Sequence, residues 1–270
     1  MKKPHVKMLA ARTGAVAVLS LGLVAGFAVA PASAQPATVT YTVLGDSYSA
    51  GSGGGGESGP CLQSPHGYGS DVAAATGAAL TLLACYGATS DDVRTMQVPA
   101  MPAATSLVTL TVGGNDVGSG AVSAACLPGI RAPGCSAAVA DSLYQLTQLP
   151  KKLGALIRAI RAKAPRARII LLGYPRLFEP AAMTALGYPA DTVSAARTIN
   201  AATDLLNAVE GITAITSGAR FVPVAAAFAG HGIPSADPWL ISPLEPSAFP
   251  FHPNATGYLD GYAATLEAAL

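Results

Sequence analysis

The stretch "TVTYTVLGDSYSAG" at residues 38–51 joins a hydrophobic run to a polar turn. The run over 38–45 is rich in β-branched residues and ends in glycine, which predicts a buried strand. Gly-Asp-Ser overlaps the end of this run, so Ser47 lies at the carboxyl end of the predicted strand. Glycine, aspartate and serine are also common turn formers. This stretch alone therefore does not distinguish a loop serine from a nucleophile.

Other segments of the chain have a similar build. Apolar runs followed by glycine or polar residues lie at 106–116, 167–175 and 219–228, and residues 80–85 form a shorter candidate strand. Strands that are apolar throughout are typical of a sheet that is covered on both faces.

Helical patterns separate these strands. Leucine and isoleucine recur at three- and four-residue steps over 143–160, where Pro150 predicts a kink, and apolar residues including alanine and valine do so over 199–212. Residues 252–270 predict a third helix with Asn254 as its N-cap. Alternating strands and helices favour an α/β fold with a central parallel sheet. In such sheets the functional residues gather at the carboxyl ends of the strands.

The first 34 residues predict a secretory signal peptide. A basic start containing Lys2 and Lys3 precedes the apolar run "GAVAVLSLGLVAGFAVA", and "PASA" offers a cleavage site after Ala34. The run is short for a full bilayer span, so we expect secretion without stable membrane insertion. The remaining residues, 35–270, suit a single domain, which we expect to be monomeric.

The charge of the mature chain disfavours nucleic acid as a partner. The whole sequence has 16 Lys and Arg against 15 Asp and Glu, and the predicted signal peptide contains four of the basic residues. The main basic cluster of the remainder, at 158–168, indicates the solvated face of a helix.

All four cysteines lie in the mature chain. They lack C-x-x-C spacing and only three histidines accompany them, so we expect no metal and no cofactor. Two disulfides suit an oxidising compartment, and four cysteines allow three pairings. The turn-rich segment "CLPGIRAPGC" favours Cys126–Cys135, which leaves Cys61 to pair with Cys85.

A nucleophilic serine needs a base and donors for an oxyanion. The mature chain offers His66, His231 and His252, and only His252 lies between two stiffening prolines, in "FPFHPN". Gly87 in "YGAT" offers a backbone amide, and Asn115 in "GGND" offers a side-chain amide. The G-x-S-x-G motif of other serine hydrolases is absent from the sequence.

Four blocks in order resemble the SGNH (GDSL) hydrolase family, and most closely its secreted actinobacterial lipases and esterases. They are "GDSYSAG" with Ser47, "CYGAT" with Gly87, "TVGGND" with Asn115 and "FHPNATGY" with His252. The resemblance implies a flavodoxin-like, three-layer α/β/α sandwich that needs no metal or cofactor. It also implies that Ser47 is the nucleophile and His252 the general base. The Ser47 and Gly87 amides and the Asn115 side chain would form the oxyanion hole.

The resemblance also bears on the cysteines and on the base. In these relatives the cysteine two residues before the second-block glycine pairs with one that follows the first block, which matches Cys85 and Cys61. The family usually has aspartate three residues before the histidine, whereas this chain has Phe249. We therefore predict that the backbone carbonyl of Phe249 orients His252. The alternative is a displaced triad completed by Asp237.

These features together predict a secreted esterase or lipase that hydrolyses carboxylic esters, either lipids or small acyl esters, through an acyl-enzyme. One alternative is a carbohydrate esterase that removes acetyl groups, because the same site serves many esters. Another is a catalytically silent binding protein on the same scaffold, which the missing aspartate favours. Turnover of a short p-nitrophenyl ester separates an enzyme from a binding protein.

Overall fold

The structure is a computed structural model that describes residues 1–2, 5 and 39–270. Apart from residues 1–2 and 5, the predicted signal peptide lies outside the described residues, as does its cleavage site. Among the helices of the described residues, none combines the length and the apolar character needed to cross a membrane.

The centre of the domain is a parallel sheet of five strands in the order β2-β1-β3-β4-β5. Each strand lies within, or one residue from, a run that the sequence predicts: β1 (Thr40–Gly45), β2 (Ala79–Leu82), β3 (Leu107–Thr111), β4 (Arg168–Leu172) and β5 (Arg220–Val222). The register places Val43 of β1 opposite Leu82 on one side and Thr109 on the other. This strand order is the flavodoxin-like order that the resemblance implies.

The helical segments lie in the connections between the strands and after β5. They are α1 (Ser47–Ala50), α2 (Tyr68–Thr76), α3 (Ser90–Asp92), η1 (Val93–Gln97), α4 (Val98–Ala100), α5 (Ser119–Cys126), α6 (Cys135–Lys163), α7 (Pro180–Ala185), α8 (Ala190–Thr216), η2 (Gly257–Ala263) and α9 (Ala264–Glu267), where η marks π-helical segments. The two predicted apolar stripes lie in α6 and α8. The Asn254 side chain accepts the Gly257 amide at 2.9 Å, as an N-cap residue does.

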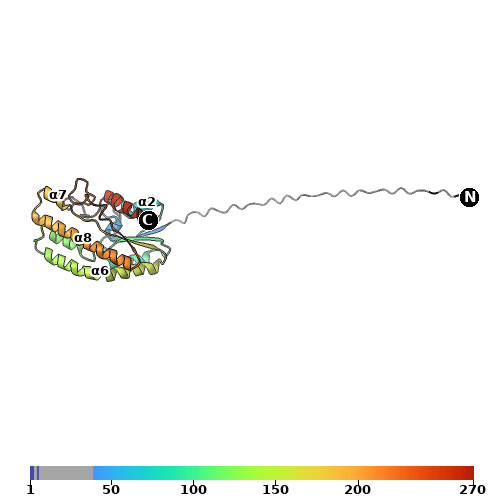
Figure 1. Ribbon diagram of the computed structural model, residues 1–270, viewed down its shortest axis with the longest axis horizontal. Coiled ribbons are helices and arrows are strands. Elements are labelled where there is room, and N and C mark those ends of the chain that lie inside the picture. Colours follow the sequence, from blue (N-terminus) through green and yellow to red (C-terminus); the bar gives the residue numbers. More distant parts are fainter. Residues whose placement is uncertain (3–4, 6–38) are drawn as a thin grey trace. The chain divides into compact units, whose positions relative to one another are not determined.

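Alternate strand residues point into two cores, one on each face of the sheet. On one face, Val43 packs with Val72 of α2 and Tyr262 of η2. On the other face, Leu110 packs with leucines of α6 and with Leu206 of α8. Figure 1 shows α6 and α8 together on one side, with α2 and the C-terminal helical segment on the other. The predicted three-layer α/β/α sandwich is therefore confirmed.

The ends of the two predicted stripes face solvent. Leu143 is 48% exposed and Ile212 is 67% exposed. The 29 residues of α6 span about 44 Å, whereas the five residues of β3 span about 17 Å, so the helix extends beyond the sheet that it covers.

The strand order creates a crevice between the carboxyl ends of β1 and β3, where the chain changes direction across the sheet. Gly45 ends β1 with a φ of +119°, and a Cβ on it would lie 2.2 Å from the Thr111 carbonyl oxygen at the end of β3. Only glycine therefore fits this close approach. The close approach of Gly45 to Thr111 brings the segment with Ser47 beside the segment with Asn115.

Candidate active site

Ser47 begins helix α1 directly after β1. The Asp46 side chain caps this helix by accepting the Tyr48 amide at 3.0 Å. A residue in the first turn of a helix has no intrahelical acceptor for its amide, and the Ser47 amide has none elsewhere among the described residues. Ser47 thus offers both its hydroxyl and its amide to the cavity that it lines.

His252 reaches Ser47 from a loop far along the chain. Its Nε2 lies 2.8 Å from the Ser47 Oγ. Ile241 holds this loop through two backbone hydrogen bonds, from the Phe251 amide to Ile241 at 2.8 Å and from the Ile241 amide to His252 at 2.9 Å. The Tyr48 hydroxyl donates to the Phe251 carbonyl at 2.7 Å. The serine and the imidazole therefore meet the geometric requirement for a nucleophile and its base.

The other imidazole nitrogen of His252 lies beside the carbonyl of Pro250, the residue that follows Phe249. His252 Nδ1 lies 3.1 Å from the carbonyl oxygen of Pro250. The Phe249 carbonyl accepts the backbone amide of His252 at 3.2 Å and so closes a turn. The turn directs the Pro250 carbonyl toward the ring, and a main-chain acceptor still occupies the position of the family's usual carboxylate.

The surroundings of His252 keep its imidazole neutral. Burial lowers the pKa of His252 below its ordinary value, although the carbonyls of Pro250 and Phe249 act in the opposite direction. A lowered pKa leaves Nε2 unprotonated at neutral pH, and an unprotonated nitrogen can accept a proton from the serine hydroxyl.

The other two histidines lie apart from Ser47. His66 is exposed in its loop. His231 stacks on Trp239 with ring centroids 3.7 Å apart, and its Nδ1 lies 2.8 Å from the Asp237 carbonyl oxygen. The Asp237 carboxylate accepts the Trp239 indole N–H at 3.2 Å. Asp237 is therefore engaged with His231 and Trp239 rather than with His252.

This placement predicts a small effect for Asp237→Asn. The amide occupies the same volume and retains an oxygen for the indole of Trp239, so kcat for a p-nitrophenyl ester is expected to stay within about threefold of wild type. Replacing the carboxylate of a true triad costs about ten-thousandfold. A loss of that size in steady-state kinetics would restore the displaced triad.

The predicted oxyanion donors lie around the same cavity. Gly87 has a φ of +78° and its amide donates to no acceptor in the part of the chain that the structure describes. Asn115 is exposed, and its Nδ2 donates to the Ala88 carbonyl at 3.0 Å. A side-chain amide has two N–H donors, so one remains available beside Ser47 and Gly87, and all three residues line the cavity.

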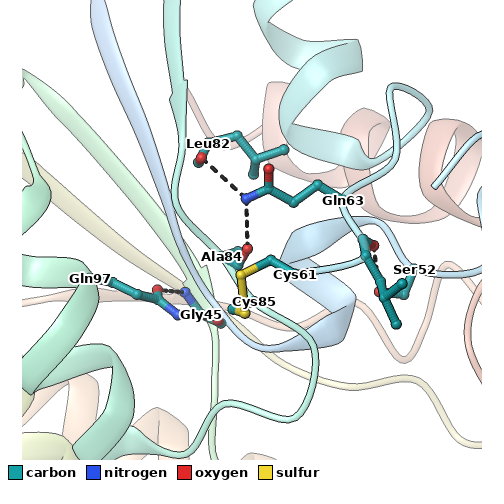
Figure 2. The surroundings of a disulfide bond; sticks show 9 residues. Gly45, Ser52, Cys61, Gln63, Leu82, Ala84, Cys85 and Gln97 are labelled. Carbon is teal, nitrogen blue, oxygen red and sulfur yellow. Dashed lines mark hydrogen bonds between the residues drawn. A yellow bond between two sulfur atoms is a disulfide. The ribbon is translucent and has the colours of Figure 1, made fainter. Parts of the chain in front are cut away.

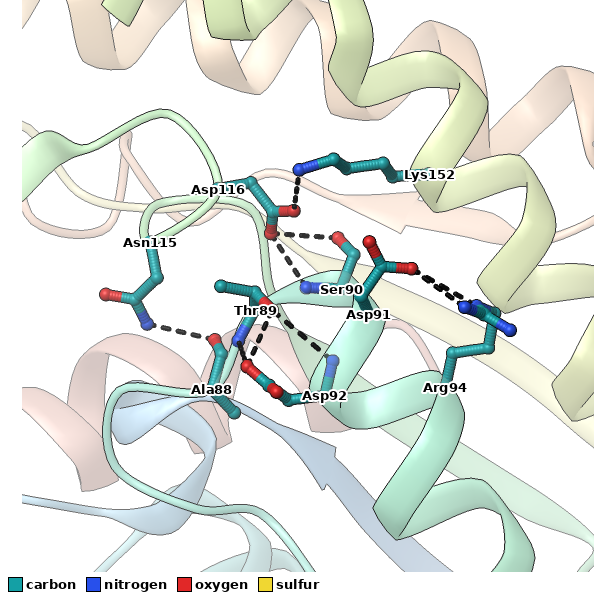
Figure 3. A network of polar contacts seen from close by, with 9 residues as sticks. All are labelled: Ala88, Thr89, Ser90, Asp91, Asp92, Arg94, Asn115, Asp116 and Lys152. Atoms are coloured by element: carbon teal, nitrogen blue, oxygen red, sulfur yellow. Dashed lines mark hydrogen bonds and ion pairs between the residues drawn. The ribbon is translucent and has the colours of Figure 1, made fainter.

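A polar network holds the loop after β3 against the loop that contains Gly87 (Figure 3). Beside the contact between Asn115 and Ala88, the Asp116 carboxylate accepts the Ser90 amide at 2.8 Å and the Ser90 hydroxyl at 3.0 Å. Its second oxygen lies 3.3 Å from the Lys152 ammonium. Asn115 and Asp116 of "GGND" therefore hold the loop after β3 against the loop that contains Gly87, and these two loops carry two of the predicted oxyanion donors.

A disulfide also restrains the Gly87 loop. The structure joins Cys61 to Cys85, 24 residues apart, beside the carboxyl end of β2 (Figure 2). The Tyr86 amide donates to the Cys61 carbonyl at 3.1 Å. The second disulfide joins Cys126 to Cys135, the end of α5 to the start of α6. These are the two pairs that the sequence favours. The Cys61–Cys85 disulfide closes a separation of 24 residues, and closing a loop of that length stabilises the folded state by about 3 kcal/mol.

Sequence reasoning missed a second network beneath the crevice. The Tyr174 hydroxyl donates to Asp46 and accepts the Gly114 amide at 3.2 Å, which links the residues that precede Ser47 and Asn115. Burial raises the pKa of Asp46 to about 6, although hydrogen bonds from Tyr174 and its other partners act in the opposite direction. The place of Tyr174, just after β4 at the carboxyl edge of the sheet, was the available signal.

Glu210 is fully buried behind this network. Neither carboxyl oxygen has a hydrogen-bond partner among the described residues, and a Cβ on Gly113 would lie 2.6 Å from its Oε1. Burial, followed by the charges of Asp46 and Asp116, raises the pKa of Glu210 well above its ordinary value.

This carboxyl makes the stability of the fold depend on pH. Below the ordinary pKa of 4.5, Glu210 is protonated in both the folded and the unfolded chain. As the pH rises above that value, only the unfolded chain releases the proton, so folded-state stability falls until the pH passes the folded pKa. Glu210→Met is expected to raise the free energy of unfolding at pH 8 by about 1–3 kcal/mol. Urea unfolding at pH 4 and pH 8 tests this, and an equal effect at both pH values would contradict it.

The cavity beside Ser47 and His252 has a volume of about 450 Å³. Its far wall is mainly apolar and comes from α5, α8 and the loop after β4, with Ala124, Leu127, Leu177 and Leu206 among its residues. In the described part of the chain, no three His, Cys, Asp or Glu side chains gather in a way that would hold a metal ion. The arrangement brings a serine hydroxyl, an imidazole and amide donors together in the lining of a largely apolar pocket.

Comparisons with known proteins show which family the whole domain resembles. The model of the GDSL-like lipase/acylhydrolase family matches residues 43–259. A lipase of Streptomyces rimosus is 38% identical over 235 residues, which cover 85% of this chain and 86% of that protein.

Two crystal structures are similar over nearly the whole domain. Phospholipase A1 from Streptomyces albidoflavus has a TM-score of 0.78 at 36% identity, and the match covers 87% of this chain and all of that chain. An extracellular lipase from Streptomyces rimosus has a TM-score of 0.77 at 35% identity, and the match covers 86% of this chain and all of that one.

Proposed function

The chain belongs to the GDSL-like lipase/acylhydrolase family and is a carboxylic-ester hydrolase, and we propose that it acts through an acyl-enzyme on Ser47 with His252 as the general base. The single observation that carries this proposal is the distance of 2.8 Å between Ser47 Oγ and His252 Nε2, which both line the cavity.

The reaction follows from these contacts. Ser47 Oγ attacks the ester carbonyl carbon while its proton passes to His252 Nε2. The carbonyl oxygen becomes an oxyanion, which the amides of Ser47 and Gly87 and the side chain of Asn115 stabilise by hydrogen bonds. The intermediate expels the alcohol, which takes the proton from His252. Water then attacks the acyl-enzyme carbonyl and loses a proton to His252. When the second intermediate collapses, the acid is released and Ser47 Oγ takes this proton back from His252.

The Pro250 carbonyl supports the base without a carboxylate. By accepting the Nδ1 proton at 3.1 Å, it selects the tautomer in which Nε2 is free to accept from Ser47. A neutral carbonyl stabilises the imidazolium less than a carboxylate does. We therefore propose a Ser47–His252 dyad with a main-chain orienting group.

We propose secretion on three grounds. Residues 1–34 have the layout of a signal peptide. The domain contains two disulfides, which persist in oxidising compartments. One of the similar crystal structures is an extracellular lipase.

We propose that the substrates are esters with an aliphatic acyl chain. The apolar wall of the cavity suits such a chain, and the similar structures are a lipase and a phospholipase A1. Initial rates with p-nitrophenyl acetate, butyrate, octanoate and palmitate, with phosphatidylcholine vesicles and with acetylated xylan test this. We expect turnover of the alkyl esters, with a preference for a chain longer than acetyl. Turnover of acetylated xylan alone would replace this proposal with a carbohydrate esterase.

Asn115→Ala is expected to lower kcat about a hundredfold, the usual loss for one oxyanion donor, with KM within about threefold of wild type. We expect kcat to fall while KM stays nearly the same, because Asn115 donates a hydrogen bond to a charge that forms only in the transition state. Steady-state kinetics with p-nitrophenyl butyrate measure both constants. A rise in KM at unchanged kcat would assign Asn115 to substrate binding instead.

A further inference from the structure

Aromatic rings surround the imidazole of His252. The ring centroid of Tyr48 lies 5.1 Å away at an interplanar angle of 38°, and that of Tyr86 lies 5.5 Å away at 26°. Phe249 is more distant, at 6.2 Å, and meets the imidazole almost edge-on at 79°. The face of Tyr86 is therefore the one most nearly parallel to the imidazole.

The carboxylates nearest to His252 form hydrogen bonds with other groups and do not pair with its imidazole. Asp46, on the segment with Ser47, directs its carboxyl to Tyr174 and Thr111. Glu57 accepts the Gly53 amide at 2.8 Å, and Gly53 itself packs against the loop that carries His252. On its own loop, His252 has only the carbonyls of Phe249 and Pro250 beside it. No carboxylate among the described residues hydrogen-bonds to His252.

The face of an aromatic ring attracts a cation that lies within about 6 Å of its centroid, because the ring quadrupole is negative there. In the proposed reaction His252 becomes an imidazolium when it takes the Ser47 proton. A ring stacked on it stabilises this form more than the neutral one. The effect is greatest where a carboxylate is absent and water is largely excluded.

Tyr86 is held in place by its backbone and is free at its hydroxyl. Its amide is bonded to Cys61, and the disulfide at Cys85 restrains the preceding residue. Tyr86 is 42% exposed, and its hydroxyl has no hydrogen-bond partner in residues 39–270. Tyr48, in contrast, bonds the Phe251 carbonyl at 2.7 Å and supports the loop itself. Of the two tyrosines, Tyr86 is thus the one whose contact with His252 can be changed without removing a hydrogen bond.

We propose that Tyr86 is a positioning residue whose ring face stabilises the imidazolium form of His252 and so takes over part of the task of the missing carboxylate. The proposal rests on the proposed role of His252 as the general base. It assigns the aromatic face, and not the hydroxyl, as the active part of Tyr86.

The test compares Tyr86→Phe with Tyr86→Leu, because phenylalanine retains the ring and leucine retains only apolar cover. Tyr86→Phe is expected to keep kcat and the pH profile of wild type. Tyr86→Leu is expected to lower kcat about five- to thirtyfold, with KM for p-nitrophenyl acetate within about twofold. The acid limb of kcat/KM should move to lower pH, since the pKa of His252 falls when its cation loses the ring. Tyr144→Leu is the matched control, because Tyr144 is an exposed tyrosine of α6 that does not line the cavity, and it should leave the acid limb unmoved.

An NMR titration of His252 in the free protein makes the result independent of turnover. If Tyr86→Leu leaves the pKa of His252 unchanged or raises it, the inference is wrong even where ester hydrolysis is intact. If wild type titrates as expected but hydrolyses no ester, the proposed function fails and the aromatic contact stands. Tyr86→Met provides a second variant without a ring, and a loss of folding in both ringless variants would assign Tyr86 to structure and overturn the inference.

Discussion

Ser47→Ala is expected to reduce kcat for p-nitrophenyl butyrate by about four to six orders of magnitude, the range that loss of a nucleophilic serine produces. Its Oγ is the hydroxyl that His252 Nε2 contacts, at 2.8 Å, and no other serine or threonine hydrogen-bonds to that nitrogen among the described residues. What remains is the contribution of the oxyanion donors and of substrate binding.

The fold should survive this change, because the Ser47 hydroxyl bonds only to His252 in the described structure. We expect the unfolding temperature to remain within a few degrees of wild type. Ser119→Ala is the matched control, since Ser119 is exposed and lines the same cavity. Its kcat should stay within a few-fold, and equal losses in both variants would point to general damage of the pocket.

His252→Gln is expected to cause a loss in kcat of similar size, because without the base the serine hydroxyl keeps its proton. The two residues act as one unit, so the double variant Ser47→Ala/His252→Gln should be no slower than either single variant by more than about tenfold. Rate measurements on all three proteins form a double-mutant cycle. Losses that multiply would mean that Ser47 and His252 contribute independently, and the dyad would then be wrong.

Much of the fold could be predicted because local pattern and global packing agree. The run before Ser47 is rich in β-branched residues, which favour a strand, and β1 lies between β2 and β3 with every residue after Thr40 buried. Parallel strands end at one edge of the sheet. The polar residues that follow β1 and β3 were therefore expected at the same edge of the sheet, which made Ser47 and Asn115 candidate site residues from the sequence alone.

The rest of the site depends on contacts that no local pattern specifies. His252 Nδ1 lies 3.1 Å from the Pro250 carbonyl oxygen, one residue after Phe249, because a main-chain oxygen requires no particular residue type and a single turn decides which carbonyl faces the ring. Tyr86 reaches His252 across more than half of the chain. Glu210 lies in a helix whose pattern gives no sign that its carboxyl is buried without a partner.

The central claim is that Ser47 is the nucleophile, and covalent labelling tests it most directly. A fluorophosphonate reacts when a serine oxygen displaces fluoride and forms a stable phosphonyl ester. Intact mass spectrometry should show one adduct per chain, formed in step with the loss of esterase activity, and peptide mapping should place it on Ser47. The Ser47→Ala protein should remain unlabelled. Stoichiometric labelling of another residue, or equal labelling of Ser47→Ala, would contradict the account.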